Sequence, residues 1–536
     1  MVTVDTQSGP VSGLRLGHAD TWLGIPYAAP PIGDLRFCAP QPVTGWSEPR
    51  SAVTFGAAAP QPDPIQQRAT PSTTLATGLM SLLYPFSGSP VGDCTMDEDC
   101  LVLNVWAPTN LDEPCPVMVW LHGGAFLHGA GSEPAFWGDR LAARQNVVVV
   151  TINHRLGALG YLPLGDDGAG QAGMLDLVMA LEWVRDNIVA FGGDPRNVTI
   201  FGQSGGGMKV ATLMAMPSAA GLFHKAIVMS GPTLRLPRPA ENEALASALC
   251  TALGVDDGDM NALRSVPVER LVSAQYAAMA MTGGAMLGWS PVVDGRHIVG
   301  DPLSSTATSA PDVPLLTGCT TEEAGMFLAM DPEYSVVDAQ TLPSRLAGDF
   351  GDDAERILAE YRAAFPTSDA KGLLRRIISD RDVRVSAGQF AEYKASASDA
   401  AVYTYLFDYD SGVLDGAIGA THSGELSFVF DNADRIPLSG IRSDRDALGA
   451  SMSAAFAAFA RTGDPSTPTA AWPPLSRNGA TMVFDGARPH VVEHVDRERL
   501  EMMSQYPSQL FERGSGSAHG ELVIEQPQSG VAQGPA

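Results

Sequence analysis

A serine flanked by glycines is the pattern in this chain best suited to chemistry. Residues from Gly202 to Gly206 read G-x-S-x-G, between the apolar run Val198–Phe201 and a helix predicted over Gly207–Met214. A serine at such a sharp strand-to-helix turn has strained backbone geometry, which flanking glycines relieve, and the helix amides point at charge developing beside it. The alternatives are a plain Gly-rich turn and a phosphate loop, but no G-K-[ST] sequence completes the latter. The context favours Ser204 as a nucleophile.

A second glycine-rich segment lies upstream, after another predicted strand. Residues Trp120–Phe126 read WLHGGAF. Consecutive small residues let backbone N–H groups approach a ligand oxygen, and each such donor is worth about 3 kcal/mol to a reaction that passes through a tetrahedral oxyanion. We therefore predict that the amides of Gly124, Ala125 and Gly205 form an oxyanion hole. An ordinary strand-ending turn is the alternative, and the coincidence with the serine motif argues against it.

The elements that must position these residues alternate between strands and helices. Pro116–Leu121 and Val147–Ile152 are continuous apolar runs, as expected of parallel strands buried on both faces. The clearest helical periodicity lies between residues 173 and 192, and another apolar run at Ala226–Met229 follows the serine motif. This alternation predicts an α/β fold with a doubly wound, parallel sheet.

We expect one catalytic domain over residues 1–513. Within it, residues from about 235 to 286 are rich in Ala, Met and Leu, which predicts an inserted helical cap. Residues 56–97 are rich in Pro, Ser, Thr and Gly and predict a long irregular excursion. Residues 514–536 have no periodicity and predict a mobile C-terminal tail.

Composition excludes several classes of function. The 536 residues are 45% hydrophobic, enough for a large core, and carry a net charge of −26, which disfavours nucleic acid and anionic membrane surfaces as partners. No apolar run is long enough to span a membrane, and no basic region followed by an apolar run indicates a secretory leader. Six cysteines without metal-ligand spacing predict no metal site. We expect a cytoplasmic protein, although a mature secreted form would look the same.

Taken together, these motifs resemble those of the type-B carboxylesterases, the family of carboxylesterases, cholinesterases and bacterial p-nitrobenzyl esterase. The likeness spans most of the chain, in the family's order. Beyond the two glycine-rich segments it rests on Gly24-Ile25-Pro26-Tyr27, Leu35-Arg36-Phe37, Glu98-Asp99-Cys100-Leu101, Asn153-His154-Arg155-Leu156-Gly157, Phe191-Gly192-Gly193-Asp194-Pro195, Thr462-Gly463-Asp464-Pro465 and Trp472-Pro473.

The resemblance implies an α/β-hydrolase fold, a mostly parallel central sheet flanked by helices with an inserted helical cap. It also implies the partners of Ser204: an acid at Glu323, in the segment GCTTEE, and a histidine at His422, in the segment HSGELSFVF. The order Ser, Glu, His is that of α/β-hydrolases. The residues alone do not single out His422 among ten histidines, or Glu323 over Glu322.

The implied function is that of a serine carboxylesterase acting on small neutral esters through an acyl-enzyme on Ser204. His422 acts as general base and then acid, Glu323 orients it, and no metal or organic cofactor is needed. The same triad could cleave amides or carbamates, and some family members are non-catalytic adhesion proteins, but those typically lack the serine. We expect a small-molecule ester substrate and favour a monomer, although the sequence does not determine the oligomeric state.

The chain departs from the family beside the nucleophile. Gln203 stands where the family usually has Glu, which weakens attraction for cationic substrates, and Gly205 stands for Ala, a change expected to matter little. The segment Ser87–Cys100 contains no aromatic residue, and this absence together with Gln203 argues against a cholinesterase. Phe126, Gln203 and Trp289 are the candidate substrate-binding residues, although a tryptophan at such a place is more often a core residue.

Overall fold

A computed structural model describes residues 1–62, 73–83, 95–109, 113–164, 169–283, 287–302, 312–475 and 478–509. The predicted mobile tail at 514–536 therefore lies outside the described residues, as do parts of the predicted irregular segment 56–97. That segment contains one helix, α2.

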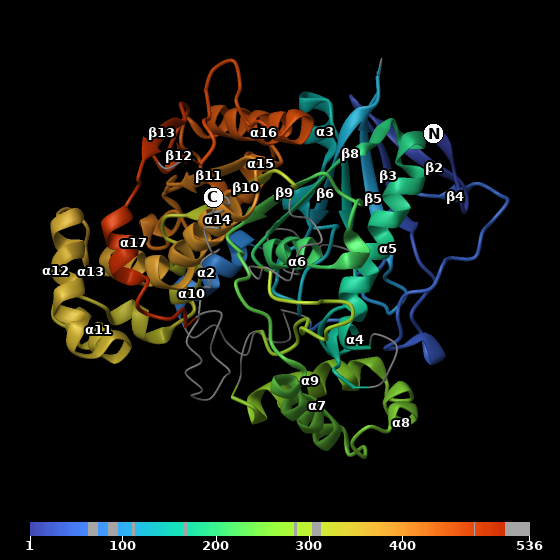
Figure 1. Ribbon diagram of the computed structural model, residues 1–536, viewed down its shortest axis with the longest axis horizontal. Helices are drawn as coiled ribbons and strands as arrows, with labels where there is room; N and C mark the ends of the chain where they lie inside the picture. Colours follow the sequence, from blue (N-terminus) through green and yellow to red (C-terminus); the bar gives the residue numbers. More distant parts are fainter. Residues whose placement is uncertain are drawn as a thin grey trace, which may run out of the picture.

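The centre of the molecule is one large sheet (Figure 1). Its strands are β1 Val2–Thr6, β2 Gly9–Leu16, β3 Ala19–Pro26, β4 Arg50–Ser51, β5 Val102–Pro108, β6 Cys115–Leu121, β7 Val148–Ile152, β8 Gly193–Gln203, β9 Lys225–Met229, β10 Leu315–Thr320, β11 Val402–Phe407, β12 Ala480–Phe484 and β13 His490–Glu493. They follow the order β1-β2-β3-β5-β7-β6-β8-β9-β10-β11-β12-β13, with β4 beside β2. All neighbours from β7 to β12 pair in parallel. The strands at both ends of the sheet pair antiparallel, except that β4 pairs in parallel with β2. The predicted mostly parallel sheet is confirmed.

Helices connect the strands and cover the sheet. They are α2 Thr74–Leu83, α3 Asp139–Gln145, α4 Gly157–Tyr161, α5 Ala172–Asn187, α6 Gly205–Met214, α7 Pro239–Leu253, α8 Met260–Arg264, α9 Val268–Met281, α10 Ala324–Ala329, α11 Leu342–Phe350, α12 Ala354–Ala364, α13 Ala370–Ser379, α14 Val385–Ala397, α15 Leu426–Val429, α16 Arg445–Thr462 and α17 Arg497–Met503. The helix expected between residues 173 and 192 is α5, and the helix after the serine motif is α6.

Strand β6 shows how the two faces are filled. Val117, Val119 and Leu121 point into a core shared with α5 and α6, whereas Met118 and Trp120 point into a second core shared with α3 and α16. Because successive side chains of a strand alternate between faces, an apolar run such as this one is buried only when helices cover both sides.

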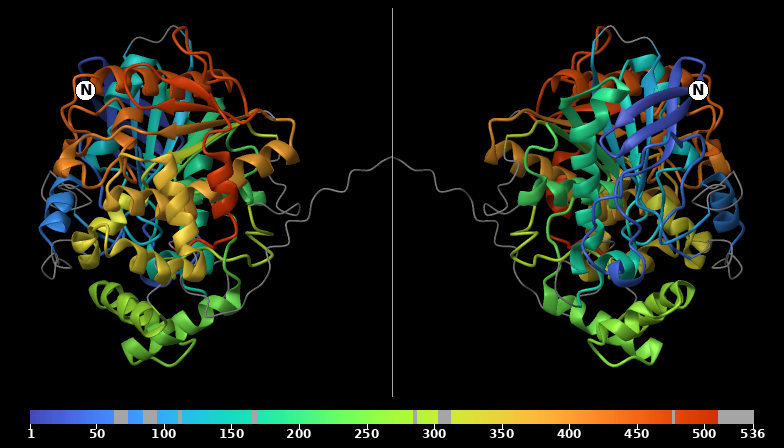
Figure 2. Two further views of the ribbon diagram at one scale, coloured as in Figure 1. Left: turned by 90° about the vertical axis from the view of Figure 1, so that its left-hand side faces the viewer. Right: turned by 90° about the vertical axis from the view of Figure 1, so that its right-hand side faces the viewer.

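The predicted cap is present as three helices. Figure 1 and Figure 2 show α7, α8 and α9 gathered at one end of the molecule, below the sheet. Arg36 ties α8 to the body, because its guanidinium pairs with Glu98 at 2.5 Å and also donates to the carbonyl oxygens of Arg264 and Val266. No helix in the described ranges is long and apolar enough to cross a membrane.

Candidate active site

Ser204 lies at the tight turn between β8 and α6. Its backbone has φ +56° and ψ −125°, a conformation that costs a non-glycine residue on the order of 1–3 kcal/mol. The turn is held by the Ser204 amide, which donates to the carbonyl oxygen of Met229 on the neighbouring strand β9 at 2.8 Å. The side chain is half-buried. Strained geometry at the end of a parallel strand is what the sequence motif predicts.

The WLHGGAF segment runs from β6 directly against this turn. Ala125 has φ +53°, again in the left-handed region. Within the described residues, the amides of Gly124, Ala125 and Gly205 donate to no acceptor of the protein. Three unsatisfied N–H groups on two adjoining segments fit the predicted oxyanion hole.

The space at Gly205 is smaller than we expected from the sequence. A Cβ at this position would lie 2.2 Å from the carbonyl oxygen of Ala125 and 2.4 Å from its Cα. This close approach argues against the expectation that Gly205 stands for Ala at little cost, because the upstream loop occupies the space of the methyl group.

His422 and Glu323 come together from the ends of two neighbouring strands. Glu323 follows β10, His422 lies beyond β11, and both side chains are buried. Nδ1 of His422 makes a short contact with a Glu323 carboxylate oxygen, and the other oxygen accepts from Thr320 N at 2.7 Å and Ser230 Oγ at 2.6 Å. The carboxylate thus fixes the orientation of the imidazole. Ser230 was not anticipated from the sequence, since nothing in its local pattern distinguishes it.

Glu322 points away from this group. Its carboxylate pairs with Arg375 at 3.1 Å and Arg376 at 3.0 Å, both on α13. Of the two adjacent acids, Glu323 is the one that reaches His422, in agreement with the sequence expectation.

The side chain of Gln203 lies between the serine turn and the imidazole. Its Nε2 is 3.2 Å from Nε2 of His422, and its Oε1 accepts from Ser423 Oγ at 3.2 Å. No hydrogen bond joins Ser204 to His422 among the described residues. Nε2 of His422, the predicted acceptor of the serine proton, thus faces the amide of Gln203 instead.

A second buried acid, Glu425, lies near Glu323 and His422. It is fully buried, and one of its oxygens lies 3.2 Å from Ser230 Oγ and accepts from Tyr405 Oη at 3.4 Å. Its other oxygen has no partner in the described structure. Burial away from water, followed by the nearby charge of Glu323, raises the pKa of Glu425 to about 7.

The other predicted substrate-binding residues are both buried. Phe126 follows the oxyanion segment, and its ring meets the edge of Tyr161 with centroids 5.1 Å apart. Trp289 is wholly buried in the core, where its indole N–H donates to the carbonyl oxygen of Gln275. Trp289 thus fits the core reading that we weighed against substrate binding, and its contact with substrate stays a prediction.

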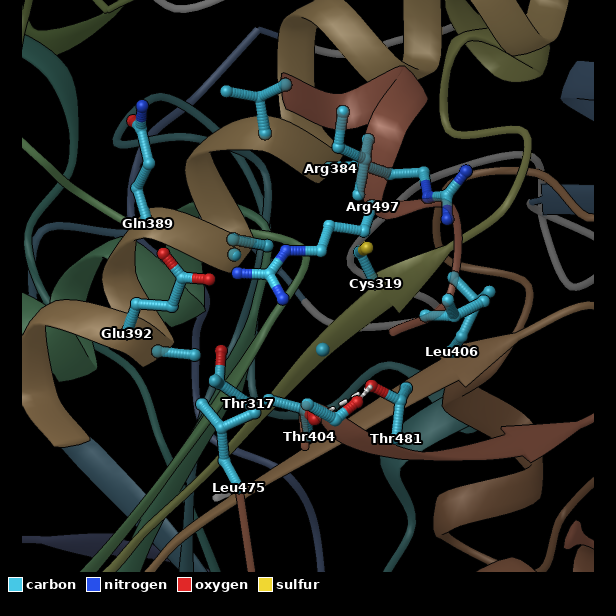
Figure 3. A pocket seen from close by; sticks show the side chains of 18 of the residues that line it. Thr317, Cys319, Arg384, Gln389, Glu392, Thr404, Leu406, Leu475, Thr481 and Arg497 are labelled. Atoms are coloured by element: carbon cyan, nitrogen blue, oxygen red, sulfur yellow. Dashed lines mark hydrogen bonds between the residues drawn. The ribbon is translucent and has the colours of Figure 1, made fainter. Parts of the chain in front are cut away.

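A pocket away from this site lies between α14, α17 and strands β10 to β12 (Figure 3). It has a volume of about 1080 Å³ and is lined by Thr317, Cys319, Arg384, Glu392 and Arg497 among others. It contains none of the triad residues. In the part of the chain that the structure describes, no three His, Cys, Asp or Glu side chains are grouped to hold a metal ion.

Comparison with known proteins agrees with this geometry. A model of the carboxylesterase family matches residues 1–503. The chain belongs to the carboxylesterase family. It is a carboxylic ester hydrolase with the α/β-hydrolase fold, as the sequence predicted.

Individual relatives support the same assignment. The chain is 36% identical to the para-nitrobenzyl esterase of Bacillus subtilis over 479 residues, covering 88% of this chain and 92% of that protein. It is 35% identical to the phenmedipham hydrolase of Pseudarthrobacter oxydans, covering 92% and 98%. Among solved structures, a Geobacillus stearothermophilus carboxylesterase superposes with a TM-score of 0.78 at 34% identity, covering 94% of this chain and all of that one.

Proposed function

We propose that this carboxylesterase works through an acyl-enzyme on Ser204, with His422 as general base and acid and Glu323 as the residue that orients it. The observation that carries the proposal is the buried contact between Nδ1 of His422 and Glu323, formed beside a serine held at φ +56°. A carboxylate on Nδ1 leaves Nε2 as the proton acceptor and stabilises the imidazolium that forms.

The reaction follows from these roles. His422 takes the proton of Ser204 as the oxygen attacks the ester carbonyl, and the resulting oxyanion is received by the amides of Gly124, Ala125 and Gly205. His422 then protonates the leaving alcohol. Water, activated by the same imidazole, releases the acid and restores the serine.

One rearrangement is required before the first step. Nε2 of His422 must exchange the side-chain amide of Gln203 for the hydroxyl of Ser204. Gln203 and His422 are both buried and adjacent, so the exchange is a local change of hydrogen-bond partner. In apo enzymes, catalytic hydrogen bonds commonly form only with substrate present.

We further propose small, uncharged esters as substrates. Gln203 offers an amide where a carboxylate would attract cations, so the immediate surroundings of the nucleophile favour neutral groups.

We also infer that the protein acts as a monomer in the cytoplasm. Five described cysteines are free thiols, as in a reducing compartment, and Cys94 lies outside the described residues. Gel filtration and cell fractionation test these two points.

The deciding experiment compares hydrolysis of p-nitrophenyl acetate, butyrate and octanoate by the wild type, Ser204→Ala and Ser453→Ala, a control at a buried serine on α16. Mass spectrometry after organophosphate treatment locates the nucleophile. We expect turnover and a single phosphoryl adduct on Ser204 in the wild type and the control, and neither in Ser204→Ala. A folded wild type with no turnover and no adduct contradicts the proposal. A matched anilide tests whether amides are also cleaved.

A further inference from the structure

A buried lysine stands next to the proposed oxyanion hole, and the mechanism above does not use it. Lys209 is on α6, four residues after Gly205, and its side chain is fully buried in an otherwise apolar helix. Removing a lysine from water is costly, and burial lowers the pKa of Lys209 to about 7. A residue retained at such a cost calls for a specific explanation.

The contacts of Lys209 are to backbone carbonyls. Its Nζ donates to the carbonyl oxygen of Ala125 at 2.8 Å and to that of His122 at 3.0 Å. It also lies 5.1 Å from the centre of the Phe126 ring, within reach of a cation–π interaction. No carboxylate in the described part of the chain forms an ion pair with it. The amine therefore contacts a single loop, residues 122–126.

These two carbonyls lie at either end of the segment Gly123-Gly124-Ala125. One peptide plane joins the His122 carbonyl to the Gly123 amide, and another joins the Ala125 carbonyl to the Phe126 amide. Fixing both planes fixes the orientation of the amides of Gly124 and Ala125 between them. This support is needed, because Ala125 has φ +53°, a conformation that persists only where the surroundings impose it.

Lys209 also joins the two parts of the proposed hole. Residues four apart lie on the same face of a helix, so Lys209 and Gly205 both face the loop. Gly205 packs against it so closely that a Cβ would lie 2.2 Å from the Ala125 oxygen. The lysine thus holds the loop against α6, the helix that carries the third amide.

We propose that Lys209 is a positioning residue for the oxyanion hole. It clamps the loop 122–126 onto α6, so that the amides of Gly124, Ala125 and Gly205 form one anion site. The neighbouring imidazoles of His122 and His154, stacked with centroids 4.9 Å apart, are kept neutral, since burial lowers the pKa of His122 to about 3 and that of His154 well below its ordinary value. This inference rests on the proposed function.

The test replaces Lys209 by Met, which keeps the length and removes the charge and the donors, and by Gln, which keeps N–H donors without charge. Lys225→Met is the matched control, because Lys225 is also buried but begins β9, at the opposite end of that strand from Ser230. Folding is checked by circular dichroism and Tm. The readouts are kcat and KM for p-nitrophenyl butyrate, and the affinities of a trifluoromethyl ketone and of its methyl ketone parent.

We expect kcat of Lys209→Met to fall about 10- to 100-fold with KM changed less than about 3-fold, since a misplaced oxyanion donor affects the transition state rather than substrate binding. The trifluoromethyl ketone, which forms a tetrahedral adduct, should lose affinity by a similar factor, and the methyl ketone should not. The kcat of Lys209→Gln should lie between that of Lys209→Met and that of the wild type. Lys225→Met should keep its kcat.

The inference fails if Lys209→Met folds and keeps kcat within about 3-fold of the wild type, or if it loses affinity equally for the two ketones. If Lys209→Met does not fold, a folded Lys209→Gln with wild-type kcat overturns the inference. The Ser204→Ala variant distinguishes failure of the inference about Lys209 from failure of the proposed function. If Ser204→Ala retains turnover, the acyl-enzyme proposal fails. If it is inactive while Lys209→Met keeps kcat, only the role of Lys209 fails.

Discussion

The side-chain amide of Gln203 lies 3.2 Å from Nε2 of His422, the nitrogen that receives the proton of Ser204 in the proposed mechanism. Ser423 Oγ donates to Oε1 of Gln203, which turns the Nε2 donor toward the ring. A neutral imidazole accepts this hydrogen bond, but an imidazolium, whose two nitrogens both carry protons, cannot. Gln203 in this orientation therefore occupies the ring nitrogen that Ser204 needs in the proposed mechanism.

Gln203→Glu replaces this hydrogen-bond donor by an acceptor. A carboxylate in place of the amide accepts from the imidazolium, so the acid limb of the kcat/KM profile should move to higher pH. It should also raise kcat/KM for butyrylthiocholine relative to the neutral isostere 3,3-dimethylbutyl thiobutyrate, by about 10-fold, equal to 1.4 kcal/mol. Steady-state kinetics over pH 5–9 with both substrates measure the two effects. An unchanged substrate ratio contradicts this account of Gln203.

Substitution of two adjacent acids should separate catalysis from stability. Glu323→Gln should reduce kcat by about 10²- to 10⁴-fold with little change in Tm, because the imidazole loses its orienting carboxylate. Glu322→Gln should keep kcat within about 3-fold but lose about 2 kcal/mol of stability, since its pairs with Arg375 and Arg376 are weakened. Each variant is the control for the other. Inactivation by Glu322→Gln with full activity in Glu323→Gln would mean that the acid is misassigned.

The buried carboxyl of Glu425 gives a pH-dependent contribution to stability. Its pKa is raised from the ordinary 4.5 to about 7, so between these pH values the folded protein holds a proton that the unfolded chain releases. Stability contributed by this group therefore falls as the pH rises through that window. Glu425→Gln cannot ionise, so its stability relative to the wild type should increase between pH 4.5 and 8, by on the order of 3 kcal/mol.

Denaturant unfolding of the two proteins at pH 4.5, 6 and 8 measures this difference. The change with pH is the informative quantity, because a fixed cost of the unpartnered amide N–H in the variant cancels from it. If the difference in unfolding free energy between the two proteins stays constant across the three pH values, the pKa of Glu425 is not raised.

Hydrophobic periodicity identified the strands and helices whose sequence patterns are local. The apolar runs that became β6, β7 and β9, and the helix α5, could be predicted because parallel strands buried on both faces and amphipathic helices have distinct signatures. The helices α11 to α14, which pack into their own apolar cluster, were not singled out. Their sequence carries no motif that marks them as a unit.

The site was predictable only in part, for a physical reason. The serine turn and the glycine-rich loop are constrained by local backbone geometry, which leaves a trace in the sequence. Gln203 and His422 are 219 residues apart, and their contact depends on the packing of several strands. Lys209 was not predicted from the sequence either, because the side chain of a single lysine in an apolar helix is ordinarily expected to reach solvent.

Gly205 is where the sequence expectation and the structure disagree most directly, and Gly205→Ala decides between them. The added methyl group would lie 2.2 Å from the Ala125 oxygen, and the loop cannot simply retreat, because Lys209 holds that same oxygen at 2.8 Å. We expect kcat to fall about 10-fold, with a parallel loss of affinity for the trifluoromethyl ketone.

The control for this substitution is Gly348→Ala on α11, where a Cβ meets open space. An alanine there should leave kcat unchanged and stabilise the protein by about 0.5–1 kcal/mol, as expected in a helix interior. If Gly205→Ala matches this control in kcat, the loop moves freely, and the sequence expectation that the substitution matters little is correct. If the double variant Gly205→Ala/Lys209→Met loses less kcat than the product of the two single losses, glycine and lysine act on the same loop position.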